Sequence, residues 1–139
     1  MRQGWPVVAA LMLVAACGAG GGASASCVGP QLVSLSPGTG AADASVTLTV
    51  DWLRNGCNDT VVVGPDGPHP ADEETPRTDV PVYFSQQPDE TLVGTMSGTG
   101  AHFRGSIRFV VPRTARPGPA TLLLGPERQH IATFAVGAS

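Results

Sequence analysis

Two short polar segments hold the side chains of this chain that could bind an ion or a partner. In the first, Asn58 and Asp59 directly follow Cys57, and Asp51 lies shortly before them. Their carboxylate and amide oxygens are suited to ligating an ion or contacting a partner. Asn and Asp also bond to their own backbone in turns, so the pattern favours an Asx turn that joins two strands. Asn58 and Asp59 are therefore candidate binding residues, with the turn as the structural alternative.

The second polar segment is acidic, with Asp72, Glu73 and Glu74 standing just after His69. Calcium takes several oxygen ligands from a loop that glycine turns sharply, whereas this stretch carries prolines. The pattern therefore predicts a solvated acidic loop, with a weak metal site as the alternative. The three acids remain candidate binding residues, and we assign no metal and no cofactor.

The chain lacks the sequence patterns of the common catalytic sites. Ser97 stands in Met-Ser-Gly-Thr rather than in a GxSxG elbow. Residues 18–22 are glycine-rich, but no lysine, strand or helix flanks them as in a phosphate-binding loop. His102 and His130 have no identifiable partner in the sequence. We therefore predict that the protein is not an enzyme.

The N-terminus combines Arg2, an uncharged apolar run over residues 7–16, and Cys17. This is the layout of a secretory signal peptide, and the run is much shorter than the ~20 apolar residues of a membrane-spanning helix. The end of the run, Val14-Ala15-Ala16-Cys17, resembles the lipobox of bacterial lipoproteins. The resemblance implies cleavage before Cys17 and a diacylglycerol on its sulfur. Two or more acyl chains would then anchor the protein stably on the extracytoplasmic face of the cell membrane.

Residues 18–26 contain only glycine, alanine and serine, a composition typical of a flexible tether. We therefore divide the chain into three segments: a signal peptide over 1–16, the lipid-anchored cysteine and tether over 17–26, and a domain over 27–139. The domain is long enough to bury one hydrophobic core.

With Cys17 lipidated, Cys27 and Cys57 are the two cysteines that remain. Outside the cytoplasm such a pair usually forms a disulfide. Closing a loop of about 30 residues would stabilise the fold by roughly 3.5 kcal/mol in the chain-entropy model. A two-cysteine metal site is the alternative, but neither cysteine lies in a CxxC pair and no histidine is near. We predict the Cys27–Cys57 disulfide, which leaves no free cysteine as a nucleophile.

The amino-acid composition indicates the kind of organism that the protein comes from and one class of partner that it lacks. The eight basic residues are all arginine and the formal net charge is −3. The arginine bias, together with much Ala, Gly, Val and Pro, suggests a GC-rich genome and an actinobacterial source. Because the sequence has no basic patch or aromatic platform, we expect no nucleic-acid partner.

Alternating apolar residues between Gly/Pro turns predict an all-β domain. The clearest strand covers residues 45–52, with Val46, Leu48, Val50 and Trp52 on one face. Other strands are expected at 31–36, 60–63, 80–86, 90–96, 103–111, 120–124 and 131–136. Residues 64–79, with four prolines, are predicted to form a long surface loop. About seven short strands in this length predict an antiparallel β-sandwich.

Two phrases carry a family resemblance. Ser36-Pro37-Gly38-Thr39-Gly40 followed by Ser45-Val-Thr-Leu-Thr-Val50 resembles the opening of IPT/TIG-type immunoglobulin-like domains. Ile107-Arg-Phe-Val-Val-Pro112, with residues 115–124 behind it, resembles a later strand pair of the same family. Asp43-Ala44 and Asp51-Trp52-Leu53 replace the family's glycine-rich pattern, which points to a looser immunoglobulin-like group found in small actinobacterial lipoproteins.

The resemblance implies an immunoglobulin-like sandwich that serves as a non-catalytic interaction or structural module of the cell envelope. Such a module would present a loop or an edge strand to an envelope or extracellular partner. The alternative is a small solute- or metal-binding lipoprotein that uses the 64–79 loop with Asn58 and Asp59.

Overall fold

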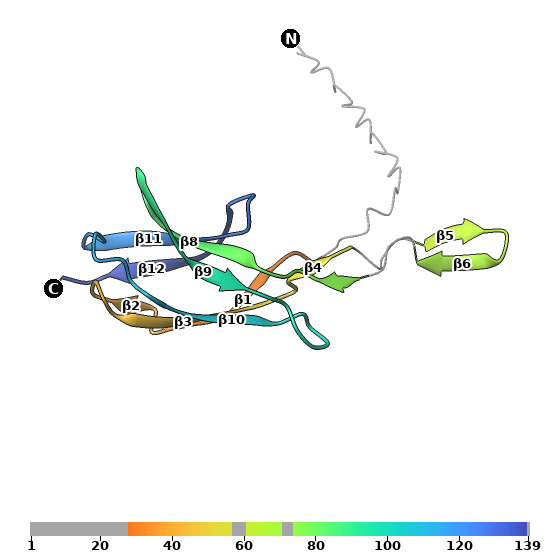
Figure 1. Ribbon diagram of the computed structural model, residues 1–139, viewed down its shortest axis with the longest axis horizontal. Helices are drawn as coiled ribbons and strands as arrows, with labels where there is room; N and C mark the ends of the chain where they lie inside the picture. Colours follow the sequence, from red (N-terminus) through yellow and green to blue (C-terminus); the bar gives the residue numbers. More distant parts are fainter. Residues whose placement is uncertain (1–27, 57–60, 71–73, 139) are drawn as a thin grey trace, which may run out of the picture.

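The computed structural model describes residues 28–56, 61–70 and 74–138 of the 139-residue chain. Within these residues the fold is all-β, with twelve strands and no helix (Figure 1). Consistent with this, the described ranges hold no helix of membrane-spanning length and apolarity. The all-β prediction is confirmed for this part of the chain.

Two sheets form the body of the molecule. The smaller is antiparallel and has the order β1-β3-β10, comprising Gln31–Ser36, Ser45–Asp51 and Gly105–Val110. The larger has the order β2-β12-β11-β8-β9, comprising Thr39–Gly40, Gln129–Val136, Gly118–Leu124, Val80–Gln86 and Asp89–Met96. It is antiparallel except for β2, which runs parallel to β12. This five-stranded sheet is curled, and it lies over the three-stranded sheet (Figure 1).

The core lies between these two sheets, as the alternation in β3 predicts. Val46, Leu48 and Val50 are fully buried, and the threonines between them are half-buried. Strands of the facing sheet contribute the other side of the same core, with Val82, Phe84, Leu122, Leu124 and Phe134. The rings of Phe84 and Phe134 meet edge to face, with centroids 6.2 Å apart. Burial of these side chains from both sheets is the main stabilising contribution to the body.

Two small sheets lie between β3 and β8 in the sequence. Strand β4, Arg54–Asn55, pairs with β7, Thr75–Pro76. Strand β5, Val61–Gly64, pairs with β6, Gly67–Pro70, to make a hairpin that extends away from the body (Figure 1).

The prediction of an unstructured loop over residues 64–79 is therefore wrong in part. The Gly64-Pro65-Asp66-Gly67 turn closes the β5–β6 hairpin, and Gly67 has a φ of 107°, which favours glycine. Prolines in this stretch suggested a loop, but an edge strand tolerates proline because its outer N–H groups need no partner. The two-residue strands β2, β4 and β7 were also missed, since two residues carry no periodicity. The fold is accordingly more elaborate than a sandwich of about seven strands.

Candidate functional site

Most residues named from the sequence lie outside the described part of the chain: Cys17, Cys27, Cys57, Asn58, Asp59, Asp72 and Glu73. Asp51 and Glu74 are described, and both belong to one group of charged and aromatic side chains. We call this group the Trp52 cluster; its members are Asp51, Trp52, Arg54, Glu74, His102 and Arg104.

The cluster begins where β3 ends. Trp52 has a φ of 65°, an uncommon conformation for a bulky residue, and the strand alternation breaks there. Leu53, instead of Trp52, takes the next core position and is fully buried, while Trp52 is only half-buried. The prediction that Trp52 continues the core face of β3 is therefore wrong, because the backbone turns at that residue.

The segment that connects β9 to β10 fixes this turn. Trp52 N donates to His102 O at 2.8 Å, and Leu53 N donates to Phe103 O at 3.0 Å. Gly98 allows the close approach, since a Cβ at that position would lie 2.3 Å from Leu53 O. Backbone contacts therefore determine where the side chains of the cluster lie.

Asp51 and Arg104 form a bidentate ion pair at the centre of the cluster. Arg104 Nε donates to Asp51 Oδ1 at 2.6 Å, and Arg104 Nη2 donates to Oδ2 at 2.9 Å. The hydrogen bond from Arg104 holds the pKa of Asp51 below its usual value, and desolvation opposes this in part. The same pair raises the pKa of Arg104. A general base needs a pKa near the working pH, so this carboxylate is suited to a structural rather than a catalytic role.

Trp52 lies against one aromatic and one cationic neighbour. The ring of His102 stacks on the indole with centroids 5.1 Å apart, and the guanidinium of Arg54 lies 5.0 Å from the indole centroid. His102 Nδ1 also lies 3.9 Å from Asp51 Oδ2. His102, which has no identifiable partner in the sequence, thus has two partners in the fold. Cation–π contacts of this kind contribute about 0.5–1 kcal/mol at exposed sites.

Glu74 is the one member of the predicted acidic segment that the structure describes. Its carboxylate pairs with Arg54 Nη1, and its side chain is 23% exposed. Arg54 Nη2 also donates to Val28 O at 3.4 Å. Arg54 therefore joins Glu74, just ahead of β7, to the first described residue of the domain.

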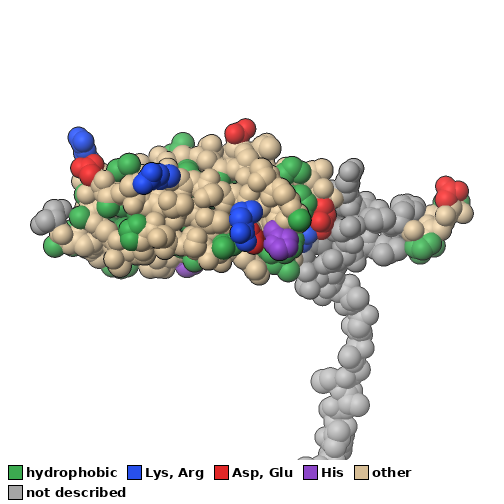
Figure 2. Space-filling model, turned by 90° about the horizontal axis from the view of Figure 1, so that it is seen from below, with side chains coloured by type: hydrophobic (Ala, Val, Ile, Leu, Met, Phe, Trp, Pro, Cys, Tyr) green, Lys and Arg blue, Asp and Glu red, His purple; other side chains and the backbone are tan. Residues whose placement is uncertain are grey.

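The roles of Arg54 and Arg104 and the stacking of His102 on Trp52 were not predicted from the sequence. The sequence did offer one signal, which is Asp51-Trp52-Leu53 at the end of the regular alternation of β3. If the chain turns there, the leucine takes the core position and the tryptophan becomes exposed. In Figure 2, basic, acidic and histidine side chains gather at the end of the body from which the hairpin extends. Within the described residues, no three His, Cys, Asp or Glu side chains are placed to hold a metal ion.

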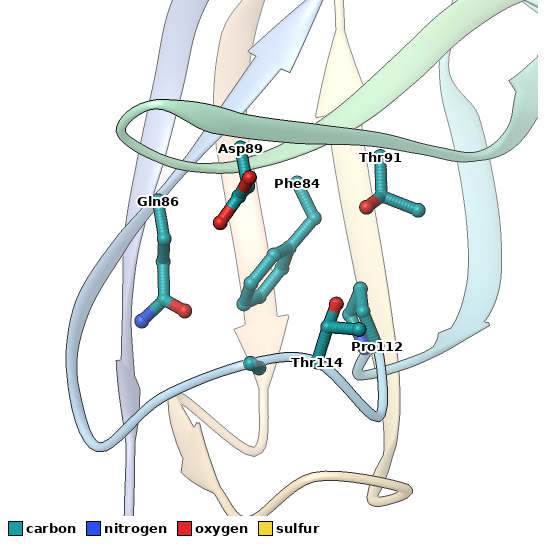
Figure 3. A pocket seen from close by; sticks show the side chains of 7 residues that line it. Phe84, Gln86, Asp89, Thr91, Pro112 and Thr114 are labelled. Atoms are coloured by element: carbon teal, nitrogen blue, oxygen red, sulfur yellow. The ribbon is translucent and has the colours of Figure 1, made fainter.

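Figure 3 shows a small cavity, and Pro112 in its lining follows β10, whose last residue pairs with Ser45 at the end of β3 opposite to Asp51. The volume of this cavity is about 10 Å³, and β8, β9 and the segment before β11 line it with Phe84, Gln86, Asp89, Thr91, Pro112, Thr114 and Ala115. A cavity of this size has room for about one water molecule. Gln86 closes one side by pairing with the backbone of Arg116, with its Oε1 and Nε2 each 2.8 Å from that residue's N and O. The cavity is therefore too small for a solute.

Comparison with known proteins identifies no relative for this chain. A scan against protein-family models gave no match, and searches of curated proteins and of solved structures gave none either.

Proposed function

We propose that this protein is a lipid-anchored envelope lipoprotein whose immunoglobulin-like domain is a non-catalytic interaction module. The β5–β6 hairpin carries the interaction part of the proposal. Val63 on this hairpin is 80% exposed, whereas the valines of β3 are fully buried. A two-stranded hairpin outside the core adds little to stability, so an interaction explains its presence better than packing does.

The strand pairing supports the immunoglobulin-like part of the proposal. In that fold, strands B and E share one sheet, and strands G, F and C lie in this order in the other. By position in the chain, β3 and β10 correspond to B and E, and β12-β11-β8 correspond to G, F and C. Strand β9 then corresponds to the additional C′ strand. Strands β1 and β2 are two parts of the first strand, one paired with β3 and the other with β12.

The lipid anchor rests on the Val14-Ala15-Ala16-Cys17 sequence and the glycine-rich tether behind it. All the strands of the core follow Val28, so removal of residues 1–16 would leave the core complete. Replacing Cys17 with serine should release the protein from the membrane fraction and remove the mass of the lipid. A variant that stays membrane-bound with an unchanged mass would contradict the anchor.

The Cys27–Cys57 disulfide fits the neighbourhood of the two cysteines. Val28 follows the first cysteine directly, Arg54 comes three residues before the second, and a hydrogen bond joins these two neighbours. The register of β1 on β3 also supports the disulfide, because Gln31, shortly after Cys27, pairs with Asp51, shortly before Cys57. Mass spectrometry of the non-reduced protein should find a Cys27–Cys57 cross-link, and two alkylatable thiols would contradict it.

The same hydrogen bond supports a proposal for where the hairpin lies relative to the membrane. Val28, which follows the tether in the sequence, and Arg54, which precedes the hairpin in the sequence, are hydrogen-bonded to each other and so lie at the same end of the body. We expect the hairpin to contact an envelope protein close to the membrane surface. The small cavity lies at the end that would face away from the membrane.

Capture from an envelope extract tests the interaction role. The bait is the chain from residue 17 with Cys17→Ser, compared with the same bait in which a short Gly-Ser linker replaces residues 61–70. Val63→Asp and Val110→Asp form a matched pair, because Val110 is 54% exposed on β10 of the body. We expect the linker variant and Val63→Asp to lose a partner that Val110→Asp retains. Equal capture by all four baits would contradict a role for the hairpin.

A further inference from the structure

The edges of the two main sheets lie beside each other, whereas the hairpin has edges of its own. A strand edge with free N–H and C=O groups can pair with another chain. In the body, β9 lies beside β10, since a Cβ at Gly94 would lie 2.5 Å from Ile107 Cδ1, and β1 lies beside β12. In the described part of the chain, β5 and β6 pair only with each other, and they extend away from the body (Figure 1). The hairpin therefore has the edges that a further strand can reach most easily.

The two prolines of β6 determine which main-chain groups of the hairpin point outward. Opposite residues of an antiparallel pair alternate between hydrogen-bonded and non-hydrogen-bonded pairs. Proline has no N–H to donate, and Pro68 and Pro70 lie opposite Val63 and Val61. These two pairs are therefore the non-hydrogen-bonded ones, in which the main-chain groups of both residues point away from the partner strand.

The two outer edges of the hairpin consequently differ. The edge of β6 presents the carbonyl groups of Pro68 and Pro70 without an N–H at either residue, so it cannot form a regular ladder. The edge of β5 presents both an N–H and a C=O at Val61 and at Val63, and the strand contains no charge and no proline. Val63 is also 80% exposed. Of the two strands, β5 alone is suited to accepting a further strand.

The sequence and register of β5 make it complementary to a second copy of itself. When Val62 of two antiparallel copies meets on a two-fold axis, Val61 of each copy lies opposite Val63 of the other. This register places the outward N–H and C=O groups of residues 61 and 63 in hydrogen-bonded pairs. Valine meets valine at every position, and two-fold contacts are the commonest way in which identical chains associate. Because an isolated two-stranded hairpin is only marginally stable, a four-stranded sheet would also stabilise it.

We propose that two copies of this chain associate through the outer edge of β5, which forms a four-stranded sheet in the order β6-β5-β5-β6. The proposal goes beyond the envelope contact proposed above, because it uses the edge of the hairpin and leaves both of its faces exposed. Purified protein alone tests it, so its failure is distinguishable from a failure of the capture experiment.

Sedimentation and light scattering between about 5 and 500 µM test the association. The sample is the chain from residue 17 with Cys17→Ser, which retains every described strand. We expect a reversible dimer in this range. Val63→Pro should raise the dissociation constant at least about tenfold, because it removes an outward N–H from each copy but no hydrogen bond within the hairpin. Val63→Thr is the matched control. It keeps the N–H and a β-branched side chain, and it should dimerise like the unsubstituted chain.

A charge exchange at residue 62 tests the register. The two copies of this residue would form a non-hydrogen-bonded pair with Cα atoms about 4.5 Å apart. Val62→Lys and Val62→Glu should each weaken dimerisation at least about tenfold, because like charges then lie directly opposite each other. An equimolar mixture of the two variants should dimerise again, and this result does not depend on how proline affects the hairpin.

The proposal is overturned if the unsubstituted chain stays monomeric throughout the concentration range. It is also overturned if Val63→Pro dimerises unchanged, if Val63→Thr weakens association as much as Val63→Pro does, or if the mixture of the two Val62 variants stays monomeric. Thermal unfolding of each variant verifies that the body is folded.

Discussion

Strand β3 and the β5–β6 hairpin are both rich in β-branched residues, yet they meet opposite environments. The three apolar residues of β3 are fully buried between two sheets, whereas Val63 of the hairpin is 80% exposed. Local strand propensity is similar in the two regions, so propensity does not explain the difference. Burial against a second sheet stabilises β3, whereas β5 and β6 pair with each other in a separate two-stranded sheet. The comparison indicates that stability resides in the body and that the hairpin is available for contact.

The largest expected effect is in the core. Leu48→Ala should lower the free energy of unfolding by about 2–5 kcal/mol, because it removes a fully buried side chain and leaves a cavity. Val63→Ala on the hairpin should change it by no more than about 0.5 kcal/mol. Chemical denaturation measures both. Similar losses for the two variants would show that the hairpin belongs to the cooperative core.

The next effect concerns the turn that ends β3. Gly98→Ala should cost about 1–3 kcal/mol, since the added methyl group would lie 2.3 Å from the backbone oxygen of Leu53. Gly137→Ala is the control, because a methyl group there meets no atom within 4 Å. Denaturant midpoints of the two variants measure the difference. If Gly98→Ala is as stable as the control, the contact between this turn and Leu53 is looser than described.

Acid should weaken the Trp52 cluster. The folded-state pKa of Asp51 lies below its ordinary value of 3.8, mainly through the hydrogen bond from Arg104. The unfolded chain therefore takes up its proton first as the pH falls. The ion pair of Asp51 with Arg104 therefore contributes fully to the free energy of unfolding well above pH 3.8. The contribution is lost as the pH falls through the folded-state pKa of Asp51.

Asp51→Asn should accordingly flatten the fall in unfolding free energy below about pH 4. Some acid dependence should persist, because the hydrogen bond from Arg77 also lowers the pKa of Glu127. Asp66→Asn in the hairpin turn is the control and leaves both ion pairs intact. Denaturation series between pH 2.5 and 6, in steps of about half a unit, give the slopes. An unchanged slope for Asp51→Asn would mean that the ion pair with Arg104 contributes no stability.

The smallest expected effect comes from removing the hairpin itself. Replacing residues 61–70 with a short Gly-Ser linker should shift the thermal midpoint by less than about 3 °C, because no residue of this segment belongs to the described core. Hydrogen exchange should agree, with faster exchange in β5 and β6 than in β3. A large drop in the midpoint would indicate that the hairpin supports the body.

The sequence by itself determined the all-β class and the position of the main strands. It could do so because an apolar residue at every second position is a local pattern. Side chains of a strand alternate between its two faces, so this pattern predicts directly that one face is buried. Val46, Leu48 and Val50 were assigned to the core from this period alone, and all three are fully buried. Gly125 and Pro126 lie in the turn between β11 and β12, and a Gly-Pro pair is a turn signal of the same local kind.

The tertiary structure decided the rest, because the deciding contacts join residues far apart in the chain. Trp52 left the core face only because backbone bonds to residues 102 and 103 turn the chain there. Asp51 and Arg104 are 53 residues apart, and no local pattern relates them. Strand β2 was recognisable only through its partner, since β1 pairs with β3 while β2 pairs with β12. Local periodicity determines which face of a strand is apolar, whereas partner strands and long-range hydrogen bonds determine where that face ends.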